Sequence, residues 1–507
     1  MDFNGLLASL ELGLATALMP VNLYYCMIGV MLGTALGVMP GIGALTAVSL
    51  LFPVTFHLDA TPAIIMLAGI YYGTAYGGST AAILLNIPGT PSSAVTCIEG
   101  YAMSKTGRAG IALFMTSIAS FFGGSIGIIL TILVSPLIVM IAFSFGAAEY
   151  FALMLLGLIA ATTLSDGSVL KGMAMVVMGI LFGTVGTDLY TGVERFNFGI
   201  PGLADGISIV AVAMGLFGIS EVIVSIRSGS SGRHDKEKVT LRSMLPTRDD
   251  TRRSWMPMLR GGGLGAFCGT LPGIGGTVAS FMAYAVEKRV NKDPSRFGTG
   301  AIEGLVAPEA ANNAADQTAF IPSLTLGVPG SATMAVILGV LIIHGITPGP
   351  RLVVEQPDLF WGLIMSFWVG NIMLLILNIP LIGIWVKLLS MPYHVLYPAI
   401  LTFCCVGVYT VGLNDFEVLI VGLLGALAYC LRLLDFPPAP FILGFVLGPM
   451  LEEEFRRAML ISRGDPAIFI SSPISGTLMG ITFVLLLVGL FGAVRRNRDL
   501  RRMSAEE

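Results

Sequence analysis

Long apolar stretches dominate this chain and are separated by short polar segments. Several of them reach or exceed the roughly 20 residues that an α-helix needs to cross the hydrocarbon core of a bilayer. The clearest are Gly110 to Val134, Ile207 to Ile226, Leu359 to Ile384 and Ile468 to Val494. The pattern predicts an all-α polytopic membrane protein with about ten to fourteen crossings or re-entrant pieces.

One motif occurs twice and each time interrupts an apolar stretch of the sequence. The run from Gly33 to Gly43 (GTALGVMPGIG) returns as the run from Gly265 to Gly275 (GAFCGTLPGIG). Proline lacks the backbone N–H and glycine disfavours helix, so each copy should break a helix inside an apolar segment. Paired interrupted helices in two halves of a membrane protein indicate a transport site at the repeat interface.

Two further pairs bear on the duplication. The run from Leu85 to Ser93 (LNIPGTPSS) matches the run from Leu326 to Thr333 (LGVPGSAT), and each follows its own Pro-Gly-Ile-Gly at a similar distance. A weaker match joins Gly179–Gly183 to Gly444–Gly448. Small residues four apart typically allow close packing of membrane helices, and we interpret this third pair in that way.

A basic linker separates the two copies. From Arg227 to Arg260 there are nine Lys or Arg residues against four Asp or Glu residues, so the positive-inside rule places this segment in the cytoplasm. We predict an N-terminal segment over 1–20, a first transmembrane repeat over 21–226, a cytoplasmic linker over 227–256, a second repeat over 257–494 and a basic tail over 495–507.

Loop charges predict that the halves are inverted. The segment from His57 to Pro62 has no Lys or Arg, whereas its counterpart from Glu287 to Arg296 has four. Equivalent loops would therefore face opposite sides, as in inverted-topology repeats with discontinuous helices. The basic tail conflicts with strict inversion, and an extra crossing near either end of the chain would reconcile the two.

Helix breaks in lipid leave backbone N–H and C=O groups that need partners, which indicates a polar cavity. Half-helices that begin at the breaks would direct positive dipole ends and hydroxyls into it, which suits a carboxylate or a coupling cation. Extramembrane turns between ordinary helices are the alternative interpretation. The candidate substrate- and ion-binding residues are Pro40, Gly41, Ile42, Gly43, Ser79, Asn86, Pro88, Gly89, Thr90, Ser92, Ser93, Pro272, Gly273, Gly275, Gly276, Thr277, Asn312, Asn313, Asp316, Pro329, Gly330, Ser331 and Thr333.

Two polar stretches could line the same cavity. Glu309, Asn312, Asn313 and Asp316 fall within one or two helical turns, and ionisable groups inside a bundle usually line a pathway. A polar helix end at the water interface explains them equally well. The corresponding stretch from Tyr71 to Thr80 offers hydroxyls, while its glycines are also explained by close helix packing.

Signals for other classes of protein are weak. Gly123-Gly-Ser125-Ile-Gly127 fits the nucleophile-elbow pattern but lies in an apolar helix without the required strand and turn. The absence of any Gly-Lys dipeptide excludes a Walker A loop, and the four histidines have no metal-ligand spacing. A net charge of -3 argues against a nucleic-acid surface. We predict no enzyme, no cofactor and no metal other than a transported ion.

Several motifs together resemble the large membrane subunit of tripartite tricarboxylate transporters, the TctA family. They are the two Pro-Gly-Ile-Gly copies, the run from Tyr71 to Gly107, and the runs Ala307–Asn313, Leu326–Ser331 and His344–Pro350. The likeness extends from about Val21 to Arg457.

The resemblance implies a secondary transporter of the bacterial inner (cytoplasmic) membrane that imports a tricarboxylate such as citrate or a related organic acid. It implies coupling to Na+, with H+ as the alternative. It implies two partners, a small TctB-like membrane subunit and a periplasmic TctC-like solute-binding protein, and an elevator-like movement. A binding-protein-independent organic anion channel or exporter is the alternative. Asp316, Gln317 and Thr318 replace a glycine pair expected there in many relatives, which leaves citrate and other organic acids open.

Overall fold

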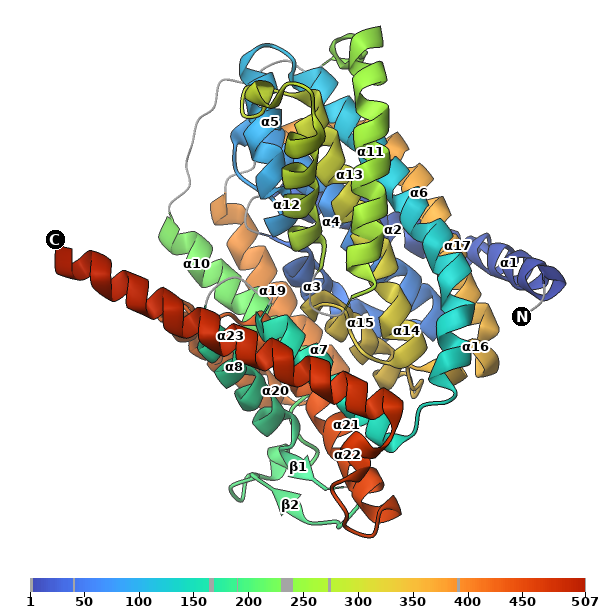
Figure 1. The fold of residues 1–507 in the computed structure, drawn as a ribbon, viewed down its shortest axis with the longest axis vertical. Coiled ribbons are helices and arrows are strands. Elements are labelled where there is room, and N and C mark those ends of the chain that lie inside the picture. Colours follow the sequence, from blue (N-terminus) through green and yellow to red (C-terminus); the bar gives the residue numbers. More distant parts are fainter. Residues whose placement is uncertain are drawn as a thin grey trace.

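The computed structural model describes residues 3–39, 42–163, 168–188, 190–228, 240–271, 275–389 and 393–506. Helices make up most of this part of the chain (Figure 1). Within it, the only strands are β1 (Gly186–Thr187) and β2 (Glu194–Arg195), which pair in an antiparallel hairpin. The prediction of an all-α polytopic architecture is confirmed, with this small hairpin as its one addition.

The first half of the chain contributes ten α-helices among the described residues. They are α1 (Phe3–Ala17), α2 (Pro20–Val38), α3 (Ala44–Thr55), α4 (Ala60–Leu85), α5 (Ala94–Lys105), α6 (Ala109–Ala142), α7 (Ala147–Thr163), α8 (Val169–Gly183), α9 (Ile209–Ala213) and α10 (Ser220–Ser228). Short 3-10 turns η1 (Pro91–Ser93) and η2 (Pro201–Leu203) lie between them, and a π-helical segment η3 (Met214–Ile219) joins α9 to α10.

The second half begins after the linker. Its helices are α11 (Arg248–Gly269), α12 (Gly275–Val290), α13 (Ile302–Thr318), α14 (Phe320–Leu326), α15 (Ala332–Ile343), α16 (Pro350–Glu355), α17 (Pro357–Asn378), α18 (Ile382–Leu388), α19 (Tyr393–Gly412), α20 (Asp415–Leu433), α21 (Ala439–Ile461), α22 (Ile468–Ser471) and α23 (Pro473–Glu506). The 3-10 turns η4 (Leu241–Met244) and η5 (Pro294–Arg296) precede α11 and α13.

Apolar helices of two lengths identify the chain as a multi-pass membrane protein. Among the described residues, α2, α6, α17 and α20 are each long and apolar enough to cross a bilayer. Shorter apolar helices include α3 and α15, with 12 residues each. At 1.5 Å per residue these two span only about 18 Å, roughly half of a bilayer with its interfaces.

Glycine stripes bring two helix pairs into backbone contact. A Cβ on the stripe of α2 or α11 would lie 2.0 to 2.5 Å from a carbonyl oxygen of the helix opposite. On α2 these glycines are Gly29, Gly33 and Gly37, facing Met66, Ile70 and Thr74 of α4. On α11 they are Gly261, Gly265 and Gly269, facing Ala307, Ala311 and Ala315 of α13. The two sequence copies therefore use the same packing.

The weak third sequence match is a packing motif. Gly179 and Gly183 of α8 face the carbonyl oxygens of Phe441 and Phe445 on α21, and Gly444 faces Val176 of α8. The two glycine motifs thus lie against each other at one helix crossing. The interpretation as small-xxx-small packing is confirmed.

Figure 1 shows where these units lie. The pairs α2–α4 and α11–α13 share the upper part of the view with α5, α6 and α12, and α11 begins at the top. Helices α7, α8 and α20 to α22 lie below with the β-hairpin. Ion pairs join Arg195 to Glu452 (2.9 Å) and Asp188 to Arg456 (3.0 Å), so α21 holds that hairpin.

Candidate functional site

The second pair of Pro-Gly breaks has the same local geometry in both halves. Helix α4 ends at Asn86 with φ 58°, and α14 ends at Gly327 with φ 70°. Asparagine and glycine are the residues that best tolerate this left-handed C-cap. After the break, Thr90 and Ser331 are extended N-cap residues whose hydroxyls lie at the start of η1 and α15. The motif is thus a helix stop followed by a helix start.

The tips of the first pair lie only in part within the described structure. Pro40, Gly41, Pro272 and Gly273 are outside the described residues. Beside them, Ile42 is buried and Gly43 is the extended N-cap of α3, while Gly275 begins α12 with φ 60°. Each break is followed directly by a helix, as the sequence predicts.

Helix α13 lies in the interior of the protein. All of its residues from Ile302 to Thr318 are buried, including Glu309, which is fully enclosed, and Asp316, which is 8% exposed. The alternative of a polar helix end at the water interface is therefore wrong. Six charged or amide side chains of this helix are buried: Glu303, Glu309, Asn312, Asn313, Asp316 and Gln317.

Asp316 joins elements of both halves. Its Oδ1 accepts a hydrogen bond of 2.8 Å from the hydroxyl of Tyr71 on α4, and Ser331 lies beside that hydroxyl. A Cβ on Gly276, at the start of α12, would lie 2.9 Å from the same carboxylate oxygen. Residues next to two of the four breaks therefore converge on one buried carboxylate.

A second set of contacts joins the breaks to one another. The hydroxyl of Ser280 on α12 donates to the backbone oxygen of Ser92 in η1 at 3.2 Å. No side chain fits at Gly89, because a Cβ there would lie 2.3 Å from the carbonyl oxygen of Gly37. The first-half breaks thus touch each other and α12 of the second half.

Glu309 is the centre of a hydroxyl cluster. Ser79 of α4 donates to both carboxylate oxygens at 2.8 Å, and Thr96 of α5 donates to Oε1. Ser120 of α6 donates to Oε2 at 3.3 Å. Four helices therefore meet at one buried carboxylate, and only Ser79 among the donors belongs to the candidate set.

The amides of α13 are incompletely hydrogen-bonded. The Nδ2 of Asn313 donates to the backbone oxygen of Glu309 (3.0 Å) and to the Oδ1 of Asn312 (2.5 Å). The Nδ2 of Asn312, the Oδ1 of Asn313 and both amide atoms of Gln317 have no partner among the described residues. Unpaired buried polar atoms are costly, and they concentrate where a protein has a functional reason to keep them.

Gln317→Leu is expected to raise the thermal unfolding temperature of the purified protein. Gln317 is 1% exposed, and its Cβ faces Gly127 of α6. An apolar side chain of similar volume removes the desolvation cost of the unpaired amide, which amounts to about 1–3 kcal/mol. Ser117→Ala is the control, because its hydroxyl bonds only to its own helix at Leu113 (2.9 Å). A lower unfolding temperature for Gln317→Leu would show that the amide has a partner.

Not every candidate is drawn into this buried region. Asn86 and Pro88 are exposed, and Thr277 is half-buried. Pro329, Gly330 and Thr333 are buried around the start of α15, where the N–H of Gly330 lies 3.4 Å from the hydroxyl of Ser323. For these positions the assignment to a binding site stays a prediction.

Sequence reasoning missed several contributors. Tyr71, Thr96, Ser120 and Ser280 provide hydrogen bonds in the buried region but were not singled out. Thr96 lies in the first turn of α5, just after the break and η1, and Ser120 is a polar residue within an apolar helix. Both positions could have been noticed in the sequence for that reason.

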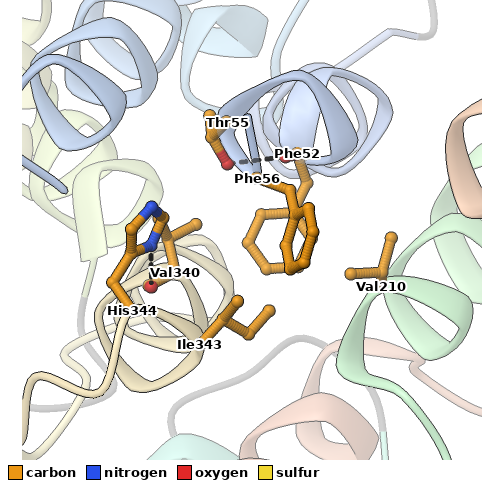
Figure 2. Close-up of a pocket in the computed structure, with 7 residues that line it drawn as sticks. All are labelled: Phe52, Thr55, Phe56, Val210, Val340, Ile343 and His344. Carbon is orange, nitrogen blue, oxygen red and sulfur yellow. Dashed lines mark hydrogen bonds between the residues drawn. The ribbon is translucent and has the colours of Figure 1, made fainter. Parts of the chain in front are cut away.

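A separate small pocket lies away from these residues (Figure 2). It is lined by Phe52, Thr55, Phe56, Val210, Val340, Ile343 and His344. Its polar side chains bond to backbone oxygens: Thr55 donates to Phe52 (2.6 Å), and the His344 ring nitrogens lie 2.8 Å from the oxygens of Val340 and Leu58. None of its lining residues belongs to the candidate set.

The apparent nucleophile elbow is a packing surface. Gly123 and Gly127 of α6 face the carbonyl oxygens of Ala310 and Ala314 on α13, and the hydroxyl of Ser125 donates to Phe121 within its own helix (2.7 Å). In the part of the chain that the structure describes, no three His, Cys, Asp or Glu residues group as metal ligands. The glycines therefore serve close approach of helices.

Comparison with known proteins agrees with this architecture. A family model described as the tripartite tricarboxylate transporter TctA family matches residues 23–443. The chain is 48% identical over 494 residues to an uncharacterised 52.8 kDa protein of the TAR-I ttuC' 3' region of Agrobacterium vitis, covering 97% of this chain and 98% of that protein. It is 52% identical over 235 residues to a protein of the TAR-II ttuC' 3' region of the same organism, covering 46% and 97%.

No solved structure matches the chain significantly. The family match spans both Pro-Gly-Ile-Gly copies, both later breaks and the whole of α13. Members of that family are components of transporters, and the family is not one of enzymes. The chain is therefore a multi-pass membrane protein that belongs to the tripartite tricarboxylate transporter TctA family.

Proposed function

We propose that this protein is the large permease subunit of a secondary transporter that imports an organic acid delivered by a solute-binding protein. The observation that carries the proposal is the convergence of Tyr71, Gly276 and Ser331 on the buried Asp316. Tyr71 comes from the first half, and Gly276 and Ser331 each lie beside a Pro-Gly break of the second half. A buried polar region between two halves, bordered by helix starts at breaks, is the arrangement in which transporters bind substrates and ions.

The helix lengths support re-entrant or discontinuous segments. Helices α3 and α15 each start at a break and span about 18 Å, too short to cross a bilayer alone. Their N-terminal N–H groups would suit a carboxylate. Together with the matching glycine stripes of α2 and α11, this supports two repeats of inverted topology and an elevator-like movement of one unit against the other.

Family membership supports the remaining parts of the proposal. The partners would be a TctB-like small membrane subunit and a TctC-like binding protein in the periplasm. The location would be the bacterial inner membrane, with the basic linker in the cytoplasm. A sodium or proton gradient would drive uptake. Citrate is one substrate to test among di- and tricarboxylates, because Asp316 and Gln317 supply polar side chains where a glycine pair was expected.

Uptake into proteoliposomes that contain all three subunits tests the proposal. Labelled carboxylates should accumulate only with the binding protein present and an inward cation gradient. Gly276→Val should reduce that uptake at least about tenfold, because its side chain would displace the Asp316 carboxylate. Gly422→Val on α20 is the control, since a Cβ there meets nothing within 4 Å.

Two results would contradict the proposal. Flux without the binding protein would favour a channel or an exporter. Absence of cation-driven uptake across the whole panel of acids, with the complex assembled, would reject import of organic acids.

A further inference from the structure

Glu309 is a carboxylate placed where a negative charge is expensive. It is 0% exposed and lies midway along α13, between α4, α5 and α6. An ionised group without a countercharge in the interior of a membrane protein costs several kcal/mol. Its surroundings must therefore provide positive charge or a proton.

The groups that face Glu309 provide no positive charge. The titratable side chains near it are Tyr76 on α4, Cys97 on α5 and Asp316 on its own helix, and α6 contributes the hydroxyl of Ser120. Among the described residues, no Lys, Arg or His pairs with Glu309, whereas Glu287 and Glu303 each pair with an arginine. The compensating cation is thus not a side chain of the described structure.

A second buried carboxylate shows what is distinctive about Glu309. Glu99, also 0% exposed, accepts hydrogen bonds from the backbone N–H groups of Gly298 (2.5 Å), Gly300 (2.8 Å) and Ala301 (2.8 Å) and from the hydroxyl of Tyr284 (2.8 Å). Backbone N–H groups only donate, so they stabilise the anion and cannot bind a cation.

Three of the groups around Glu309 are aliphatic hydroxyls, and the fourth is the side-chain amide of Asn312. A hydroxyl donates one hydrogen bond and offers two lone pairs, so it can turn its oxygen toward a cation when one arrives. Ser79 already has a second acceptor, the carbonyl of Ala75 at 3.1 Å, to which its proton can turn. Oxygen ligands around a carboxylate are also the set that hard cations prefer.

We propose that Glu309, Ser79, Thr96 and Ser120 form a binding site for a monovalent cation, a sodium ion or a proton, that neutralises the buried carboxylate. The cation binds to the carboxylate oxygens, and the three hydroxyls complete its oxygen shell or, for a proton, accept the new O–H. Asn312, one turn along the same helix face, brings its side-chain amide close to the Glu309 carboxylate. Its Nδ2 makes no hydrogen bond of normal geometry among the described residues.

The position of the site links its occupancy to the breaks. Thr96 lies three residues after Ser93, which closes the capping box of η1, and the backbone oxygen of Ser92 accepts from Ser280 of α12. A cation at Glu309 therefore acts on α5 and, through it, on the contact between the two halves. As the coupling step this rests on the proposed function, but cation binding itself does not.

Cation binding is measured on the full-length protein in nanodiscs, with no carboxylate present. Binding of radioactive sodium and thermal unfolding are recorded in acidic and alkaline buffers, with sodium or choline as the monovalent cation. Wild-type protein is expected to bind sodium saturably in alkaline buffer and to lose it in acid, as protons compete. Glu309→Gln should lose this binding, and Ser120→Ala should weaken it at least about tenfold.

Ser117→Ala, one turn before Ser120 on α6, should bind as the wild type does. If sodium does not bind but acid stabilises the wild type and not a folded Glu309→Gln variant, the occupant is a proton. Equal responses of the wild type and Glu309→Gln to both sodium and pH would overturn the proposal. Because no substrate is used, failure of carboxylate uptake would leave this result unaffected.

Discussion

Gly265→Ala is expected to destabilise the protein by about 3 kcal/mol or more and to reduce the yield of folded protein sharply. The added Cβ would lie 2.0 Å from the carbonyl oxygen of Ala311, so α11 and α13 would have to separate. The atoms that the new Cβ would meet are all backbone atoms of Ala311, so no flexible side chain can move aside to make room. Yield after size-exclusion chromatography and thermal unfolding in detergent measure the effect.

Gly263→Ala provides a control on the same helix. A Cβ at this position meets nothing within 4 Å, and alanine favours helix over glycine by about 1 kcal/mol. The variant should be as stable as the wild type or slightly more stable. Equal loss of stability in both variants would mean that α11 is sensitive to any change and that the glycine contact is not the cause.

Glu99→Ala is expected to cause the second large loss of stability. The substitution leaves three backbone N–H groups without their acceptor: Ala301 is buried, Gly300 is half-buried and Gly298 is exposed. A buried unsatisfied group such as the N–H of Ala301 costs about 1–3 kcal/mol and a more exposed one costs less, so the loop before α13 should detach from α5. We expect limited proteolysis to cut that loop faster than in the wild type, and thermal unfolding to occur at a lower temperature.

Tyr284→Phe separates the contribution of the phenol from that of the backbone N–H groups. It removes the one side-chain donor, 2.8 Å from Glu99, and leaves the three backbone hydrogen bonds in place. The expected loss is about 1 kcal/mol. If Tyr284→Phe were as damaging as Glu99→Ala, the phenol and not the loop amides would hold the carboxylate.

The predictable part of the fold was local. Breaks at Asn86 and Gly327 follow from residues that tolerate a left-handed cap, followed by a proline that cannot continue a helix. The close packing at Gly179 and Gly444 likewise follows from small residues spaced four apart. In both cases the sequence contains the whole cause within a few residues.

The candidate site was predictable only in part. The sequence identified Asp316 and Ser79 as candidates, because charged and hydroxyl side chains are uncommon within apolar segments. It gave no means of pairing Asp316 with Tyr71, or Ser79 with Glu309, since such pairs depend on which helices are neighbours and how each is rotated. The candidate set included Asn312 and Asn313 but not Glu309, whose hydroxyl partners lie on three other helices.

The sequence by itself determined that this is a multi-pass membrane protein with paired helix breaks and a glycine-rich stripe in each half. Composition and backbone chemistry act locally, so these features can be read along the chain. Only the tertiary structure decided that α13 is buried along its whole length, that three backbone N–H groups and a phenol donate to Glu99, and that the hydroxyls of three other helices surround Glu309. The physical reason is that the energy of a buried charge depends on groups distant in sequence, which become its neighbours only after the helices pack.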